Sequence, residues 1–162
     1  QPSLAWENDV TESGGFACVG LVRPKTAAHI GSVLRAAHAF GAASVVVERG
    51  RYKRTPTDVS AAYGVLPLLH CEDLHTMIPF GCVPVAVELI EGARSLFDYE
   101  HPERAFYVFG AEDQTLGKRH LAWCRDVIYI PTEVCLNLGA CVNVVLYDRL
   151  AKSHRNRAES VP

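Results

Sequence analysis

The segment from Ala105 to Leu150 decides the fold and reads AFYVFGAEDQTLGKRHLAWCRDVIYIPTEVCLNLGACVNVVLYDRL. Two short apolar runs in it, 105–109 and 127–130, are typical of buried strands. Each run stops at a residue that bends or frees the backbone, Gly110 after the first and Pro131 after the second. Ligands of α/β proteins bind in the loops that follow buried strands. The segment therefore predicts two strands with ligand-binding loops at their ends.

A long apolar segment closes this stretch, and we predict a helix from Asn137 to about Ser153. Its apolar residues recur three or four positions apart, which is the helical period. Asn137 stands at the start, where an asparagine side chain caps free backbone N–H groups. The polar residues 154–162 are expected to form a frayed tail. The residues that carry the period are Leu138, Cys141, Val142, Val145, Leu146 and Arg149.

Strand-like and helix-like segments alternate along the whole chain. Pro84, inside one apolar run, indicates either an edge strand or the start of a strand. The alternation predicts an α/β fold in which a parallel sheet is flanked by helices on both faces. The predicted strands are 16–22, 44–47, 65–69, 82–87, 105–109 and 127–130, and the predicted helices are 25–41, 57–63, 72–78, 96–99, 118–124 and 137–153.

The length of 162 residues, 49% of them hydrophobic, suits one domain with a single core. We predict that this domain spans 16–153, between an N-terminal extension at 1–15 and the polar tail at 154–162. The six cysteines include no C-x-x-C pair, which is typical of a reduced cytosolic protein with buried thiols. No apolar run approaches the ~20 residues of a membrane helix, and the first residues lack the order of a signal peptide. We expect a cytoplasmic protein with no membrane partner and no metal.

The charge distribution bears on a nucleic-acid partner. A net charge of -2 and a pI of about 6.4 provide no global basic field that would attract RNA. A local cluster remains in the stretch ERGRYKR. Its cations Arg49, Arg51, Lys53 and Arg54 are candidates for binding RNA phosphates, and Tyr52 is a candidate for stacking on a base. A solvated loop is the alternative interpretation.

Three stretches carry the candidate functional motifs: HIGSVLRAAHAFG (29–41), FGAEDQTLG (109–117) and IPTEVCLNLGACVNVVLYDR (130–149). The separation of Gly110 from Gly117 exceeds that of a phosphate-binding P-loop, and an arginine replaces the hydroxyl residue that would hold magnesium. No G-x-G-x-x-G follows a predicted strand, so a classical dinucleotide site is unsupported.

In this order and at these distances, the three stretches resemble the motifs of the SpoU/TrmH class of SPOUT RNA methyltransferases. The resemblance runs from Phe16 to about Lys152. It implies transfer of a methyl group from S-adenosylmethionine to a ribose 2′-hydroxyl of RNA, with tRNA as the expected substrate and ribosomal RNA as the alternative. It also implies a deep trefoil knot at the C-terminal end of the parallel sheet, and a homodimer that pairs through the knotted region.

Carried over position by position, the resemblance implies a catalytic set of Arg35, Glu112, Asn137 and His29. Glu112 would fix its loop or orient a basic partner, with a solvated carboxylate as the alternative. A plain helix N-cap explains Asn137 equally well. The cofactor would be held largely by backbone groups, with apolar side chains beside the adenine. The implied cofactor-binding residues are Val87, Glu88, Leu89, Phe109, Gly110, Ala111, Ile130, Pro131, Cys135 and Leu138.

Arg35 poses a chemical question. A guanidinium has a pKa above about 12, so a role as base requires strong perturbation or coupling to an RNA phosphate. Its alternative role is to orient that phosphate and stabilise developing alkoxide charge. A surface arginine with a packed stem is the structural alternative.

Three residues depart from the family's pattern: His29 stands for Asn, Cys135 for Ser and Thr115 for Gly. His29 can still exchange hydrogen bonds and accept a proton, although a helix-face or core histidine is the alternative. Cys135 is a poorer hydrogen-bonding group than serine, so activity is expected to be reduced or retuned. The competing hypotheses are a non-catalytic RNA- or S-adenosylmethionine-binding protein on the same fold, and a small-molecule methyltransferase, which only the acidic pI supports.

Overall fold

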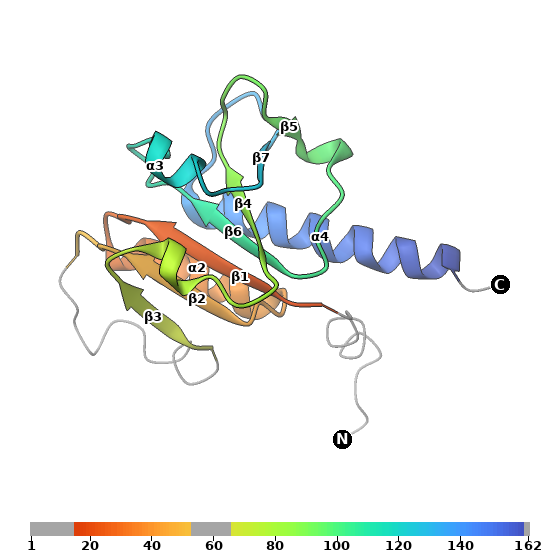
Figure 1. Cartoon of the computed structure of the whole chain (residues 1–162), viewed down its shortest axis with the longest axis horizontal. Coiled ribbons are helices and arrows are strands. Elements are labelled where there is room, and N and C mark those ends of the chain that lie inside the picture. Colours follow the sequence, from red (N-terminus) through yellow and green to blue (C-terminus); the bar gives the residue numbers. More distant parts are fainter. Residues whose placement is uncertain (1–14, 53–65, 161–162) are drawn as a thin grey trace.

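The computed structural model describes residues 15–52 and 66–160 and contains one seven-stranded sheet (Figure 1). All its strand pairs are parallel, as the sequence predicts, and their order is β3-β2-β1-β6-β4-β7-β5. The strands are β1 (Ala17–Val22), β2 (Ser44–Glu48), β3 (Leu68–Cys71), β4 (Val83–Val87), β5 (Arg94–Ser95), β6 (Ala105–Phe109) and β7 (Asp126–Tyr129).

The two central strands, β1 and β6, are buried along their whole length. Both consist of continuous apolar residues because both faces of a covered parallel sheet are dry. Their pairing aligns Ala17 with Ala105 and Leu21 with Phe109. The segment that decides the fold therefore supplies one of the two innermost strands.

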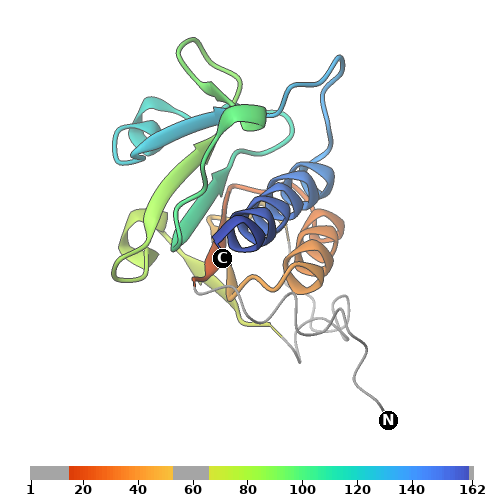
Figure 2. The same ribbon diagram turned by 90° about the vertical axis from the view of Figure 1, so that its right-hand side faces the viewer.

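Helices cover the two faces of the sheet unequally. On one face, α2 (Ala27–Ala39) and α4 (Leu138–Ser160) lie side by side and pack on each other (Figure 2). Within 15–52 and 66–160, the helices on the other face are short: η1 (Leu74–Met77) and α3 (Lys118–Leu121). A further 3-10 turn, η2 (Leu96–Asp98), follows β5. Helices on both faces are thus confirmed, with the larger core cluster beneath α2 and α4.

The first long helix forms as its sequence predicts. Thr26 is the N-cap, and its hydroxyl accepts a hydrogen bond from the backbone N–H of His29 at 3.4 Å. Gly41 follows the helix with φ of 69°, a conformation that glycine adopts at little cost. The buried face consists of Ile30, Val33, Leu34, Ala36 and Ala37.

The last helix starts at the expected place but ends later. The Asn137 side-chain oxygen accepts a hydrogen bond from the N–H of Ala140 at 2.8 Å, so the predicted N-cap is confirmed. The predicted end near Ser153 is wrong, because the helix continues to Ser160. Arg149 donates to two carbonyls of the 102–103 loop at 2.6 Å, and Lys152 donates to carbonyls at 96 and 99. These contacts hold the part of α4 before Ser153. In the last turns, Arg157 donates to the Ser153 hydroxyl at 3.4 Å and the Ser160 hydroxyl donates to the carbonyl of Asn156 at 2.7 Å.

Other boundaries shift by a few residues. The strand expected at 65–69 is Leu68–Cys71, and the two-residue strand β5 was not predicted. The helix expected at 118–124 ends at Leu121, and the helix expected at 57–63 lies outside the described residues. Pro84 is near the start of β4, which is the second of its two interpretations. The edge position is wrong, because β4 pairs with β6 and β7.

Two further observations concern membranes and metal ions. None of the described helices is both long and apolar enough to cross a membrane. Within 15–52 and 66–160, no group of three or more His, Cys, Asp and Glu side chains is placed to hold a metal ion.

Candidate functional site

The implied cofactor-binding loops follow strands β4, β6 and β7, which are neighbours in the sheet. Val87 at the end of β4 aligns with Phe109 on one side and with Ile128 on the other. The N–H of Glu88 donates to the carbonyl of Ile128 at 2.9 Å. Because parallel strands end at the same edge, the loops beginning at 87, 109 and 130 meet there. The structure thus gathers the three predicted loops into one site.

A carboxylate connects two of these loops. One oxygen of Glu88 accepts the N–H of Leu89 at 3.0 Å, and the other accepts the N–H of Leu116 at 2.8 Å. Leu116 is buried, so this bond fastens the end of the 110–117 loop against the sheet. Glu88 therefore braces the loops in addition to presenting polar atoms at their surface.

Glycine is favoured at position 110 for a structural reason as well as for the functional one that the resemblance implies. A Cβ atom at this position would lie 3.0 Å from the carbonyl oxygen of Gln114 and 3.4 Å from the nitrogen of Leu116. The loop folds back over Gly110, and a side chain there would require its backbone neighbours to shift by a few tenths of an ångström. Ala111, which follows, is buried. The close approach at Gly110 is made by the chain itself.

The loop between β7 and α4 mixes exposed and buried residues. Cys135 is exposed and Ile130 is partly buried against the core. Leu138, expected beside an adenine, is only 5% exposed and belongs to the main core cluster. Pro131, directly after β7, is partly buried. Ile130 and the exposed Leu89 therefore offer more apolar surface at this edge than Leu138 does.

Close packing of α2 on α4 brings two motifs together. A Cβ atom at Gly139 would lie 2.5 Å from the hydroxyl oxygen of Ser32 and 3.7 Å from the side-chain oxygen of Asn137. The Ser32 hydroxyl donates to the carbonyl of His29 at 2.8 Å. The start of α4 thus lies against the first turns of α2. Ser32 was not among the predicted residues, since a lone serine in a helix gives no signal of this contact.

His29 contacts Glu112 across the boundary between α2 and the 110–117 loop. Nδ1 of His29 lies 2.7 Å from Oε1 of Glu112, with the two side chains 32% and 21% exposed. The two atoms are close, but the angle between them lies outside hydrogen-bond geometry. The buried Nδ1 therefore lies beside the carboxylate and forms no hydrogen bond with it. Of the two roles implied for Glu112, the orientation of a basic partner is the one this geometry supports.

Arg35 lies on the same helix. Its side chain is exposed and forms no hydrogen bond or ion pair with any residue that the structure describes. One terminal nitrogen lies 3.9 Å from the position of a Cβ atom at Gly31, four residues earlier. The side chain therefore runs back along α2 toward its N-terminus, where His29 lies. As far as the described residues go, this guanidinium is available to an anionic ligand.

The predicted basic cluster is only partly described, because Lys53 and Arg54 lie outside the described residues. Nε of Arg49 donates to the carboxylate and to the carbonyl of Glu72, both at 3.1 Å. Arg51 forms two hydrogen bonds with Asp113, at 2.6 and 3.2 Å. The two described arginines are thus paired with carboxylates, which sequence reasoning did not foresee.

A buried polar pair lies under the site and was not predicted. Glu48, at the end of β2, is 1% exposed, and its Oε1 lies 2.9 Å from Nε2 of His120 on α3. Its second oxygen accepts the N–H of Leu74 at 2.8 Å. Buried charges need such partners. Glu48 thereby anchors α3 and η1 to β2 of the sheet.

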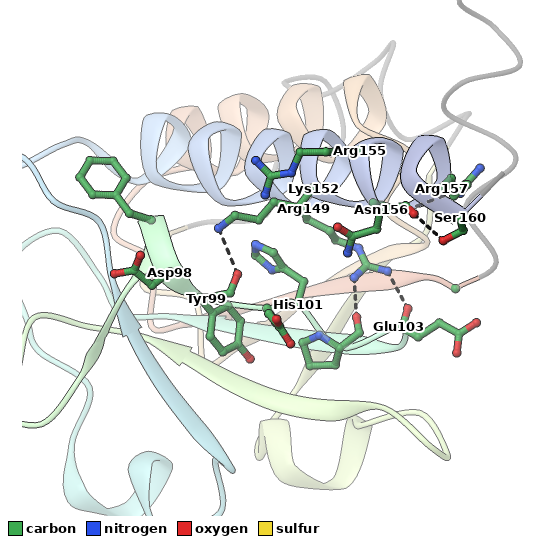
Figure 3. A pocket seen from close by; sticks show the side chains of 15 residues that line it. Asp98, Tyr99, His101, Glu103, Arg149, Lys152, Arg155, Asn156, Arg157 and Ser160 are labelled. Carbon is green, nitrogen blue, oxygen red and sulfur yellow. Dashed lines mark hydrogen bonds between the residues drawn. The ribbon is translucent and has the colours of Figure 1, made fainter. Parts of the chain in front are cut away.

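A cavity of about 690 Å³ lies at the opposite edge of the sheet, between α4 and the loop before β6 (Figure 3). Its lining mixes cations of α4 with carboxylates of the loop. Arg149 and Lys152, which reach into it, are already bonded to loop carbonyls. It contains no predicted site residue, and its lining includes Asp98, Glu100, Glu103, Arg149, Lys152 and Arg157.

The sheet is parallel, and loops that carry glycine and carboxylate residues gather at the carboxyl ends of its strands. This arrangement is typical of the class of α/β proteins that bind a ligand at that edge of the sheet. Comparison with family models identifies the particular family. Residues 17–147 match the model of the SpoU rRNA Methylase family, and the chain belongs to that family. Its proteins are RNA methyltransferases, and S-adenosylmethionine is their cofactor.

Solved structures share the fold at low sequence identity. The SpoU methyltransferase AviRb from Streptomyces viridochromogenes matches with a TM-score of 0.75 and 22% identity over 91% of this chain, which spans 62% of the AviRb chain. AviRb in complex with the cofactor AdoMet matches with a TM-score of 0.73 and 21% identity, over 85% of this chain and 57% of that one. A structure described as giving insights into the 2-OH methylation of C/U34 on tRNA matches with a TM-score of 0.72 and 23% identity, over 85% of this chain and 91% of that one. A search of curated proteins finds no match.

Proposed function

We propose that this protein transfers a methyl group from S-adenosylmethionine to a ribose 2′-hydroxyl of RNA, with tRNA as the substrate. The observation that carries the proposal is the guanidinium of Arg35, which has no ion pair among the described residues and runs back along α2 toward the turn that carries His29. Family membership supports methyl transfer to RNA. The tRNA assignment is supported by the neighbour concerned with 2-OH methylation of tRNA, which is similar to this chain over most of both lengths.

The residues at the edge of the sheet fit the cofactor. Leu89 and Ile130 provide apolar surface of the kind that flanks an adenine, and the backbone of 109–111 provides hydrogen-bonding groups beside it. The Glu88 carboxylate offers an acceptor close to both loops. When bound, S-adenosylmethionine supplies a methyl group activated by a positively charged sulfur. No side chain needs to activate the methyl group, so the residues have to position the hydroxyl and remove its proton.

His29 is suited to hold that proton. The Glu112 carboxylate lies 2.7 Å from Nδ1 without an aligned hydrogen bond, and a small rotation of either side chain would let an Nδ1–H donate to it. The other nitrogen, Nε2, is then an acceptor. We assign Nε2 of His29 as the proton acceptor for the 2′-hydroxyl and Glu112 as the residue that selects this tautomer.

Arg35 has the electrostatic role. Its guanidinium is a cation that makes no competing ion pair among the described residues. We assign it to an RNA phosphate beside the target ribose and to the negative charge that develops on O2′. Asn137 caps α4 and holds the neighbouring loop in place, so it acts through position.

The trefoil knot and the homodimer belong to the same proposal. An exposed apolar strip on α4 supports pairing, with Val144 37% and Tyr147 61% exposed. The ring of Phe40 packs edge-on against Tyr147 at 6.0 Å, so α2 contributes to the strip. Such aromatic surface is typical of protein interfaces.

The test is methyl transfer to RNA with labelled S-adenosylmethionine and unmodified tRNA. The wild type is expected to label tRNA, and Arg35→Ala to lose ~10²- to 10⁴-fold in rate with cofactor binding unchanged. Arg155→Ala removes an exposed arginine near the other end of α4 and serves as the matched control. Cofactor binding without transfer would favour the non-catalytic alternative, which the departure at Cys135 supports. Label confined to small molecules would contradict the RNA assignment.

A further inference from the structure

An arginine after β2 holds the 110–117 loop in place. Nη2 and Nη1 of Arg51 donate to the two oxygens of Asp113 at 2.6 and 3.2 Å, which is a bidentate pair. Nζ of Lys25 lies 3.9 Å from the same carboxylate. The pair lies at the surface, with the Arg51 side chain 25% and the Asp113 side chain 40% exposed. Solvent and ligands can therefore reach the contact.

Two hydrogen bonds other than those to Asp113 orient Arg51. Its backbone N–H donates to the carbonyl of Pro24 at 3.0 Å, and its Nε donates to the carbonyl of Arg23 at 2.9 Å. These bonds connect the end of β2 to the end of β1 and leave the two terminal nitrogens directed at one acceptor. A fixed guanidinium fork fits a phosphate as well as it fits a carboxylate.

The carbonyl that orients Arg51 comes from a strained residue. Arg23 has φ of 49°, in the left-handed region, which is uncommon for a residue with a side chain. Its N–H donates to the carbonyl of Glu48 at 2.8 Å while its own carbonyl accepts from Arg51. Arg49, which follows the neighbouring strand, has φ of 46°. Strained backbone of this kind persists where the surroundings over-determine it and gathers at binding sites.

Positive charge exceeds negative charge around Asp113. Arg51 and Lys25 share its carboxylate, and Arg23 is an exposed third cation with no side-chain partner among the described residues. The hydrogen bonds from Arg51 hold the pKa of Asp113 below its usual value, so the carboxylate stays ionised. Glu112 is a second carboxylate that acts on Arg51, so three cations face two carboxylates, and the remaining positive charge lets the site accept a further anion.

We propose that Arg51 and Lys25 form a binding site for a backbone phosphate of the substrate RNA, and that Asp113 occupies this site in the free protein. The proposal rests on the proposed function, which supplies RNA as the ligand. An arriving phosphate takes the place of the carboxylate on the guanidinium fork. The 110–117 loop then keeps its attachments at Glu88 and Glu112 and loses the one at Asp113. RNA binding at this site thereby changes how the 110–117 loop, one of the implied cofactor loops, is held.

The test measures RNA affinity separately from methyl transfer, using fluorescently labelled unmodified tRNA. Asp113→Asn keeps the shape of the side chain and removes its charge, so the phosphate no longer has to displace a carboxylate. We expect it to bind tRNA ~3- to 10-fold more tightly at low salt, with the slope of log K against log salt steeper by about 1. Glu159→Gln makes the same change of charge near the end of α4 and is the matched control. Its effect should be smaller than twofold.

A double-mutant cycle assigns the effect to the pair. Arg51→Ala is expected to weaken tRNA binding, and Asp113→Asn should then give no further gain, because the fork is gone. The proposal is overturned if Asp113→Asn changes the affinity for tRNA no more than Glu159→Gln does. It is also overturned if Asp113→Asn still tightens tRNA binding in the Arg51→Ala background, or if the Asp113→Asn protein binds no tRNA. Methyl transfer distinguishes this failure from that of the proposed function. If the wild type methylates tRNA while Asp113→Asn binds tRNA like the control, the phosphate site is contradicted and the proposed function is not.

Discussion

Nδ1 of His29 lies 2.7 Å from Oε1 of Glu112, so a histidine on the first long helix contacts a carboxylate that follows the central strand β6. The two residues are far apart in the sequence and come from two different motifs. Their contact makes the first helix part of the site that the three loops form. It also places Nδ1, and not Nε2, against the Glu112 carboxylate.

A substitution at His29 tests whether this residue accepts a proton or only forms hydrogen bonds. Asparagine, the residue most frequent in the family at this position, keeps a hydrogen-bonding group but cannot accept the proton. We expect His29→Asn to lose ~10²-fold in kcat with little change in KM for S-adenosylmethionine. Single-turnover methyl transfer measures this. Full activity in His29→Asn would assign the residue to hydrogen bonding alone.

Glu112→Gln tests the orienting role. The amide keeps the size of the side chain and no longer selects the tautomer with hydrogen on Nδ1, so kcat is expected to fall ~10-fold or more. Thermal denaturation serves as the control, because loss of one partly exposed contact should change the melting temperature little. Glu72→Gln, at an exposed carboxylate paired with Arg49, is the matched variant and should retain its rate. A melting temperature lowered as much as the rate would indicate a structural role instead.

Gly139→Ala tests the packing of α2 on α4. The new Cβ would lie 2.5 Å from the hydroxyl of Ser32 and 2.8 Å from its Cβ, so the helices must separate. We expect a loss of ~1 to 3 kcal/mol in the free energy of unfolding, measured by urea denaturation, and a lower rate because Asn137 moves with α4. Gly117→Ala is the control, since a Cβ there meets nothing within 4 Å. Equal effects of the two substitutions would contradict the packing argument.

Stability is expected to depend on pH through His101, a residue of the loop before β6. Its Nε2 lies 2.8 Å from Asp148 on α4, and its Nδ1 lies 2.5 Å from the hydroxyl of Tyr107. Burial lowers the pKa of His101 from 6.5 to about 4, against the opposing effect of Asp148. The imidazole is therefore neutral, donating to Asp148 and accepting from Tyr107, and it connects α4 to β6.

The direction of the pH effect follows from this shift. As the pH falls below 6.5 the unfolded chain binds a proton at His101 before the folded chain does, so stability is complete above 6.5 and declines between 6.5 and 4. The loss amounts to about 3 kcal/mol at ~1.4 kcal/mol per pKa unit. Urea denaturation at several pH values measures it. His101→Gln removes the titrating group, and an unchanged pH dependence in that variant would assign the effect elsewhere.

Cys135→Ser restores the residue that the family has at this position. Cys135 is exposed, so the change costs little packing, and the hydroxyl is a stronger hydrogen-bonding group than the thiol. We expect kcat to rise several-fold with no change in melting temperature. Cys71→Ser, outside the implied cofactor loops, is the control and should leave kcat unchanged. A rate that stays the same in Cys135→Ser would mean that this position does not limit catalysis.

The strands, the two long helices and the parallel sheet could be predicted because each depends on a local pattern. Continuous apolar runs predict β1, β2 and β6, and the helical period predicts α2 and the start of α4. The two-residue β5 was missed because so short a strand has no pattern of its own. The end of α4 was placed too early because its last turns, beyond Ser153, are polar and have no apolar period that would extend the helix.

The candidate site divides in the same way. The motifs identified the residues of the catalytic set and the cofactor loops, since spacing along the chain is visible in a sequence. The contact of His29 with Glu112, the bidentate pair of Arg51 with Asp113 and the buried Glu48 depend on pairing between distant segments. Only the tertiary structure decided those partners, because hydrogen bonds and ion pairs require atoms within about 3 to 4 Å and directions that strand order and helix packing set.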